Sequence, residues 1–442
     1  MRARLAFTIC ILVCIVGLLL TSSWAETGGT DLIVTLKDNQ SIDRVHRIHG
    51  TRTLKKVPGS PIYLIHSDSP DDGRLIRKLR RDLSVDAVEK NVRLTLQSNT
   101  TQPILGQNMD MLLDGRDLTT FFGTYVIKAY ANQQALALVR ANAVRGISTG
   151  AGTRVAYIDT GVDTRHPALR PWLDDGVDLV FNTSVSELSG LSQNMDLLLD
   201  QNMDMLLDNR FMFLLNQNMD SLLDNGSGAR FPSAFGHGTL VAGLIHLIAP
   251  EARIVPIKAF DVYGYTTLFT IVDAVYRAIG LDVDVLNMSF STTQDSEILG
   301  KAIARARAIG IAVVASVGND GRDARIIYPA SFPGVYGVAA TDFDDHIANY
   351  SNRGKSVSIS APGSAVVSTA PGGRYAAAWG TSFSAPIVSG AMALLASTRA
   401  HGQSDSSLVV NTADNIDKLN PGFERTLGKG RLNVYKALMA GR

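Results

Sequence analysis

Ser382 is the residue of this chain whose type and position best suit chemistry. It follows a glycine turn and opens a helical pattern of apolar residues that continues to Leu395. Its hydroxyl is therefore expected at a helix N-terminus, where free N–H groups and the helix dipole favour negative charge. A serine hydroxyl is a weak nucleophile by itself, so another side chain must supply a base.

Two earlier segments supply a base and an orienting carboxylate. The apolar strand pattern over 154–158 ends at Asp159 and then breaks at a glycine, whereas His237 stands between two glycines at the start of an apolar helical pattern. We expect His237 to take the proton of Ser382 during attack and return it to the leaving amine. Asp159 would fix the tautomer and stabilise the imidazolium.

Asn319 is the candidate oxyanion donor. A second apolar strand pattern, 312–317, is followed by Asn319 in a turn bounded by glycines. Its amide group and the backbone N–H of Ser382 would together bind the negative charge of a tetrahedral intermediate.

With Asp159, His237 and Ser382 in this order, residues 120–442 resemble the subtilisin-like serine peptidases, the subtilase family. In chymotrypsin-like peptidases the histidine of the triad comes first in the chain. In α/β-hydrolases the serine comes first, within a Gly-x-Ser-x-Gly motif, whereas position 384 is serine and not the second glycine of that motif. Aspartic peptidases need two Asp-Thr-Gly motifs, and the chain has one. The resemblance implies a serine endopeptidase that acts on polypeptides through an acyl-enzyme.

The resemblance also implies the substrate-binding residues. Ser289, Phe290 and Ser291 would form the edge that pairs with substrate backbone, although the family usually has glycine where Ser291 stands. Ile327 takes a position, often glycine, at the floor of the main specificity pocket. We therefore predict a shallow pocket that accepts small or medium apolar residues at P1, the position before the scissile bond.

The family usually binds stabilising calcium ions, but this chain departs from the family pattern there, so we expect no metal and no cofactor. The family's usual calcium ligands come from a loop after the histidine helix and from an acid after the His-Pro that follows the catalytic aspartate. Here the helical pattern runs on through 247–248, and Ala168 takes the acidic position. Cysteine is absent beyond residue 14, and no His-x-x-x-His motif occurs.

The N-terminus predicts export. Two arginines precede an apolar run, 5–20, and small residues precede a possible cleavage after Ala25, so residues 1–25 read as a secretory signal and the protein as extracellular or periplasmic. An uncleaved membrane anchor is the alternative. Both cysteines lie within this segment. The formal net charge of +1 gives no reason to expect nucleic acid as a partner.

Residues 26–106 alternate strand and helix signals and predict a small α+β domain. Its place before a peptidase resembles the family's propeptide, a ferredoxin-like intramolecular inhibitor that would keep the enzyme latent. A spacer without inhibitory role is the alternative. Residues 107–118 form a linker, and residues 119–442 form the catalytic domain.

Eight-residue repeats of the form Gln-Asn-Met-Asp-x-Leu-Leu-Asp occupy residues 193–224 in four copies, of which the third is degenerate, and a fifth copy lies at 107–114. A helix would stack like charges at every fourth position, and a β arrangement fits equally well. The alternatives for this insertion are an inert flexible loop, a partner-binding element and a ladder of calcium sites.

From His237 onward, strand and helix patterns alternate, which predicts an α/β fold with a doubly wound, mostly parallel sheet. Ligands bind such sheets beyond the carboxyl ends of the strands, where Asp159, Asn319 and Ser289 would lie. The main hypothesis is a secreted serine endopeptidase made as a latent precursor. The competing hypothesis is a binding or adhesion protein with an idle triad that uses the octads for contact.

Overall fold

The computed structural model describes residues 29–69, 71–96, 117–187, 234–323, 326–398 and 405–441, together with the backbone of Leu214–Leu215. The expected signal segment, the linker octad and the four inserted octads lie outside the described residues, apart from that pair. The chain divides into two compact units, Met1–Asn91 and Val92–Arg442. Within the described part, no helix is long and apolar enough to cross a membrane.

The first unit has the strand and helix order β-α-β-β-α-β, the order of a ferredoxin-like fold. Its antiparallel sheet has the order β2-β3-β1-β4. The apolar faces of both helices and the sheet share one core that includes Leu32, Val45, Ile65 and Leu79. The elements are β1 (Thr30–Leu36), α2 (Ile42–His49), β2 (Arg52–Lys56), β3 (Ile62–Ser67), α3 (Asp72–Arg81) and β4 (Val85–Lys90).

The second unit is built on a seven-stranded sheet of order β16-β15-β14-β13-β8-β11-β9, in which every neighbouring pair is parallel. This confirms the predicted α/β sheet. Strands that follow β8 in sequence lie on both sides of it, so the carboxyl end of β8 is the switch point where such sheets bind ligands. The strands are β8 (Arg154–Asp159), β9 (Val177–Asp178), β11 (Arg253–Lys258), β13 (Val285–Met288), β14 (Ala312–Ser316), β15 (Tyr336–Thr341) and β16 (Ile359–Pro362).

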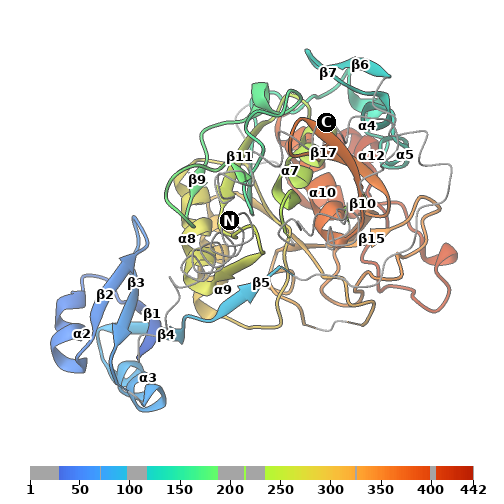
Figure 1. Cartoon of the computed structure of the whole chain (residues 1–442). Coiled ribbons are helices and arrows are strands. Elements are labelled where there is room, and N and C mark those ends of the chain that lie inside the picture. The colour runs from blue at the N-terminus through green and yellow to red at the C-terminus, as the bar shows by residue number, and fades with distance from the viewer. Residues whose placement is uncertain are drawn as a thin grey trace, which may run out of the picture. The chain divides into compact units, whose positions relative to one another are not determined.

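Two buried helices, α7 (His237–Ile248) and α10 (Thr381–Ala396), pack side by side against this sheet (Figure 1). Every residue of α7 is buried, as is α10 up to Leu395, which fits helices that are apolar on all sides. The helices α8 (Leu268–Gly280) and α9 (Glu297–Ala308) pack on each other and on the sheet, and keep a polar face in solvent.

Smaller elements complete the second unit. β10 pairs with β18 and β18 with β17, β12 pairs with β5, and β6 pairs with β7. Their bounds are β5 (Arg93–Thr95), β6 (Leu118–Phe121), β7 (Thr124–Ile127), α4 (Lys128–Ala131), α5 (Gln134–Leu138), η3 (Asn142–Val144), η4 (Arg170–Trp172), β10 (Leu214–Leu215), β12 (Tyr265–Thr267), β17 (Val366–Ala370), β18 (Arg374–Ala378), α11 (Ser407–Asn411), η7 (Asp417–Leu419) and α12 (Val434–Ala440).

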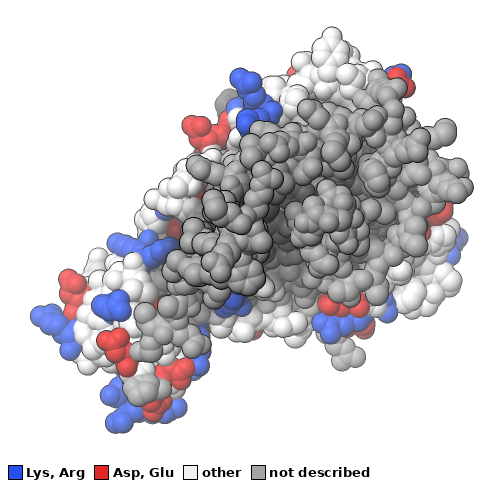
Figure 2. Space-filling model, in the orientation of Figure 1, with Lys and Arg blue, Asp and Glu red and all other residues white. Residues whose placement is uncertain are grey.

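Charged side chains of both signs are interspersed on the surface. On the face drawn in Figure 2, the described Lys and Arg side chains lie close to Asp and Glu side chains and form no broad area of a single sign.

Candidate active site

Asp159 is the last residue of β8 and lies fully buried at the carboxyl edge of the sheet. Its Oδ1 accepts a hydrogen bond from the backbone N–H of Thr160 at 2.8 Å. The turn that follows therefore holds the carboxylate in one orientation.

His237 is the first residue of α7 and is 4% exposed. The helix begins against the turn that follows Asp159, because a Cβ built on Gly238 would lie 2.1 Å from the carbonyl oxygen of Gly161. Only glycine at position 238 allows this approach, which brings the imidazole to the end of β8.

The His237 imidazole and the Asp159 carboxylate are directly hydrogen-bonded. Nδ1 lies 2.8 Å from Oδ1, and since a carboxylate only accepts, Nδ1 carries the proton. Nε2 is then the acceptor, and it has no hydrogen-bond partner among the described residues. Burial lowers the pKa of His237, but the charge and hydrogen bond of Asp159 outweigh it and raise the pKa above its usual value. This arrangement is that of a general base with a free lone pair.

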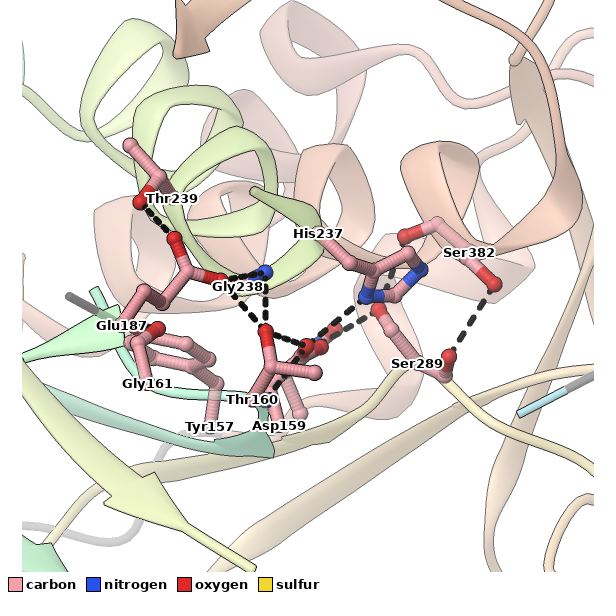
Figure 3. Close-up of polar contacts among 11 residues, drawn as sticks. Tyr157, Asp159, Thr160, Gly161, Glu187, His237, Gly238, Thr239, Ser289 and Ser382 are labelled. Carbon is pink, nitrogen blue, oxygen red and sulfur yellow. Dashed lines mark hydrogen bonds and ion pairs between the residues drawn. The ribbon is translucent and has the colours of Figure 1, made fainter. Parts of the chain in front are cut away.

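Ser382 occupies the first turn of α10, and Figure 3 shows the imidazole of His237 between Asp159 and Ser382. The Oγ atom of Ser382 donates to the backbone oxygen of Ser289 at 3.0 Å, and Ser289 Oγ donates back to the backbone oxygen of Ser382 at 2.7 Å. Ser382 Oγ therefore does not make the expected hydrogen bond to His237 in this structure. Catalytic hydrogen bonds often tighten only when substrate is bound.

Asn319 lies beside the start of α10. Its Oδ1 accepts from the backbone N–H and the hydroxyl of Thr381 at 2.8 and 2.9 Å. This leaves Nδ2 as a donor without a partner among the described residues. A Cβ at Gly380, whose φ is 145°, would come within 3.4 Å of Nδ2, so glycine keeps the space beside the amide open.

The predicted substrate-binding residues lie on two joined segments. Ser289, Phe290 and Ser291 directly follow β13 and are all buried. Thr292 exchanges two backbone hydrogen bonds with Tyr328, at 2.7 and 2.8 Å, which joins this segment to the one that carries Ile327. The first segment contacts Ser382 through Ser289, and the second segment is joined to the first.

Ile327 itself is only 2% exposed, and its N–H donates to the hydroxyl of Ser331 at 2.8 Å. Phe290 packs against Phe260 with a centroid separation of 5.2 Å. Large apolar side chains thus occupy both segments.

Three polar residues near the site were not predicted from the sequence. Thr160 begins the turn after Asp159 and accepts from the Gly238 N–H of α7, and Glu187 accepts from both residues. Asn287 donates to Ser289 Oγ at 2.9 Å and accepts from a serine of α10. An asparagine inside an apolar strand is a signal that could have identified Asn287, whereas nothing local marks Glu187.

Among the described residues, no group of three or more His, Cys, Asp or Glu side chains could hold a metal ion. At the C-terminus of α7, Arg145 donates to the carbonyl oxygens of Leu247 and Ile248 at 2.6 and 2.7 Å. A guanidinium therefore provides the positive charge at this helix end.

Comparisons with known proteins identify the family of this chain. The model of the subtilase family matches residues 150–430. Thermitase of Thermoactinomyces vulgaris is 30% identical over 66% of this chain and 90% of its own length. The minor extracellular protease Epr of Bacillus subtilis (strain 168) is 36% identical over 46% of this chain and 33% of its own.

Among solved structures, fervidolysin from Fervidobacterium pennivorans, described as a keratinolytic enzyme related to subtilisin, has a similar fold. The TM-score is 0.66 at 21% sequence identity, and the match covers 93% of this chain and 61% of that chain.

Proposed function

Since this chain belongs to the subtilase family and is a subtilisin-like serine endopeptidase, we propose that Asp159, His237 and Ser382 form its catalytic triad. The observation that carries the proposal is the 2.8 Å contact between His237 Nδ1 and Asp159 Oδ1, with Nε2 free beside the helix that bears Ser382.

In the proposed mechanism, Ser382 Oγ turns from the Ser289 carbonyl to His237 Nε2 when a peptide binds. It then attacks the scissile carbonyl as Nε2 takes its proton, and Asp159 stabilises the imidazolium. Asn319 Nδ2 and the Ser382 backbone N–H donate to the oxyanion. The imidazolium returns its proton to the leaving amine, and water hydrolyses the acyl-enzyme by the same steps.

Labelling with an active-site-directed fluorophosphonate tests the triad. We expect the mature protein to be modified at Ser382 in parallel with its hydrolysis of casein, and the Ser382→Ala and His237→Ala variants to be neither labelled nor active. A folded mature protein that resists labelling would refute the triad and favour an idle subtilisin fold.

Latency is the second part of the proposal: residues 26–106 act as an inhibitory propeptide, and its last strand, β5, pairs with the catalytic domain. In support, β5 pairs antiparallel with β12, and the N–H of Leu96 donates to the carbonyl oxygen of Gly264 at 2.8 Å. The guanidinium of Arg93 also lies 3.6 Å from the ring centroid of Tyr265. An extended segment that adds a strand in this way mimics a bound peptide.

Export and self-processing complete the proposal: the signal 1–25 directs secretion, and the chain is cut within 97–119. The relative Epr is an extracellular protease, which supports export. Mass spectrometry of the secreted protein should find a new N-terminus in this interval, and Ser382→Ala should abolish it. An unchanged N-terminus in the variant would mean that another peptidase makes the cut.

Substrate selectivity is proposed to follow from Ile327. A branched, buried side chain at the floor of the main pocket favours small or medium apolar P1 residues. A panel of fluorogenic peptides tests this, and Ile327→Gly should extend cleavage to Phe at P1. A wild-type preference for Phe or Arg would refute the assignment.

A further inference from the structure

Glu187 is a buried carboxylate beside the proposed triad that the mechanism does not use. Its side chain is 0% exposed. Oε1 accepts from Thr160 Oγ1 at 2.5 Å and from the backbone N–H of Gly238 at 3.2 Å, and Oε2 accepts from Thr239 Oγ1. Figure 3 shows Glu187 at the start of the histidine helix, with these three donors around its carboxylate.

We infer that Glu187 is a positioning residue that ties the turn after Asp159 to the first turn of α7 and so fixes the imidazole of His237. This inference rests on the proposed triad.

The contacts connect the end of β8 with the start of α7. Thr160 directly follows Asp159 at the end of β8, and Gly238 directly follows His237 at the start of α7. One carboxylate therefore contacts the neighbour of each member of the pair. Thr160 Oγ1 also accepts from the Gly238 N–H at 3.0 Å, which closes the connection. Reaction rates fall steeply when catalytic groups are misplaced by about 1 Å, so this connection bears directly on turnover.

Glu187 also supplies the negative charge that the start of α7 lacks. The N-cap residue is Gly236, which has no side chain to accept from the free N–H groups of the first turn. The positive end of the helix dipole would disfavour an imidazolium at His237. A carboxylate at this end offsets that effect.

The groups that face Glu187 favour its ionised form. Two hydroxyls and one N–H donate to it, and Lys258, which donates to the backbone oxygen of Ser186 at 3.0 Å, adds a positive charge nearby. Burial and the charge of Asp159 act in the opposite sense and raise the pKa of Glu187. Tyr157 is the remaining titratable group that faces it, and burial raises the pKa of that phenol well above its usual value, so it stays neutral.

The test is Glu187→Gln in the mature enzyme, which keeps the shape of the side chain and removes the charge. We expect kcat to fall about tenfold with little change in KM, the effect of losing one charge-assisted hydrogen bond. The midpoint of the acidic limb of kcat/KM should move to lower pH, because the negative charge that favours the His237 imidazolium is gone. Simple loosening of the fold would not move that midpoint.

Glu251→Gln is the matched control. Glu251 accepts a hydrogen bond from the Thr149 hydroxyl, just beyond the other end of α7, and does not contact the site. Its replacement should leave kcat and the acidic limb unchanged. If Glu187→Gln behaves like this control, the inference is overturned.

A second pair of variants tests the role of Glu187 if Glu187→Gln does not fold. Thr239→Val should then lower kcat and Thr239→Ser should not, because only serine keeps the hydroxyl that donates to Glu187. Equal kcat values for these two variants would reject the positioning role. The His237 titration can also be read by NMR in Ser382→Ala, where no turnover is needed. A mature wild-type enzyme without activity would refute the triad. If adding Glu187→Gln to the Ser382→Ala variant leaves the pH titration of His237 unchanged, only the inference about Glu187 is refuted.

Discussion

Helix α7 carries a histidine near each end, and the protein shifts their pKa values in opposite directions. Burial lowers the pKa of His237, but Asp159 and Glu187 raise it above the usual 6.5. Burial, Arg145 and His166 lower the pKa of His246 to about 3. The helix dipole alone would do the reverse, because it favours a cation at the C-terminus and disfavours one at the N-terminus.

The difference shows that side chains from distant segments control the two helix ends. Glu187 lies 51 residues before Gly238, and Arg145 lies 103 residues before Ile248. At the first end the added charge favours proton transfer. At the second, the guanidinium of Arg145 satisfies the last carbonyl groups and stabilises the packing. We therefore expect changes at the N-terminal end of α7 to lower activity and changes at its C-terminal end to lower stability.

The largest effect is expected at the N-terminal end. His237→Ala should lower kcat roughly a millionfold, the size of loss known for a subtilisin, since the nucleophile loses its base. The thermal unfolding midpoint should change little. Both values can be measured on the purified mature variant, and a loss of folded protein instead of activity would contradict the separation.

At the opposite end, Arg145→Met should destabilise the protein by about 3 kcal/mol, because two buried carbonyl groups lose a charged donor. The activity of each folded molecule should stay unchanged. Chemical unfolding in the inactive Ser382→Ala background gives the stability without self-digestion.

Arg145→Lys is the control, because it keeps the positive charge but not the planar guanidinium. We expect it to lose less stability than Arg145→Met. Unchanged stability in Arg145→Met would mean that the guanidinium is not needed there.

His246→Leu should make stability less sensitive to acid. A folded pKa of about 3 against 6.5 in the unfolded chain means that the unfolded state binds the extra proton as the pH falls below 6.5. Between pH 7 and pH 5 the wild type should lose about 2 kcal/mol through this group. The variant should lose that much less, measured by unfolding at each pH, and identical curves would contradict the assignment.

The smallest effect is a shift in the pH profile. Because the pKa of His237 is raised above 6.5, its neutral form becomes the major form only at a pH above that value, so the acidic limb of kcat/KM should have its midpoint there. The same shift adds stability that is fully present below pH 6.5 and is lost as the pH rises through the folded pKa. Replacing the exposed His346 by Gln is the control and should not move the limb; a midpoint at or below 6.5 would contradict the shift.

Much of the sheet and of the candidate site could be predicted from the sequence because its signals are local. Apolar runs such as 154–158 end at a polar residue and a glycine, and parallel strands bring those ends to one edge. Asp159 and Asn319 were recognisable as candidates for this reason, and His237 because glycines flank it at the start of an apolar helical pattern.

Features that depend on long-range contact could not be predicted. Neither Glu187 nor Arg145 lies in a periodic pattern that points to α7. Strand β2 is fully exposed and carries no alternation, so it has no sequence signal. The hydrogen bond of Ser382 to Ser289, in place of His237, depends on a side-chain rotation that the sequence does not encode.

The pairing of β5 with β12 has a consequence for the timing of activation. In this two-stranded sheet β5 covers one edge of β12, so a second extended chain cannot pair with that edge while β5 is bound. Cutting the peptide chain beyond Leu96 breaks none of these backbone hydrogen bonds. Under the proposed latency, cleavage and the onset of turnover are therefore separate events, and the delay between them is set by how fast the two strands β5 and β12 separate.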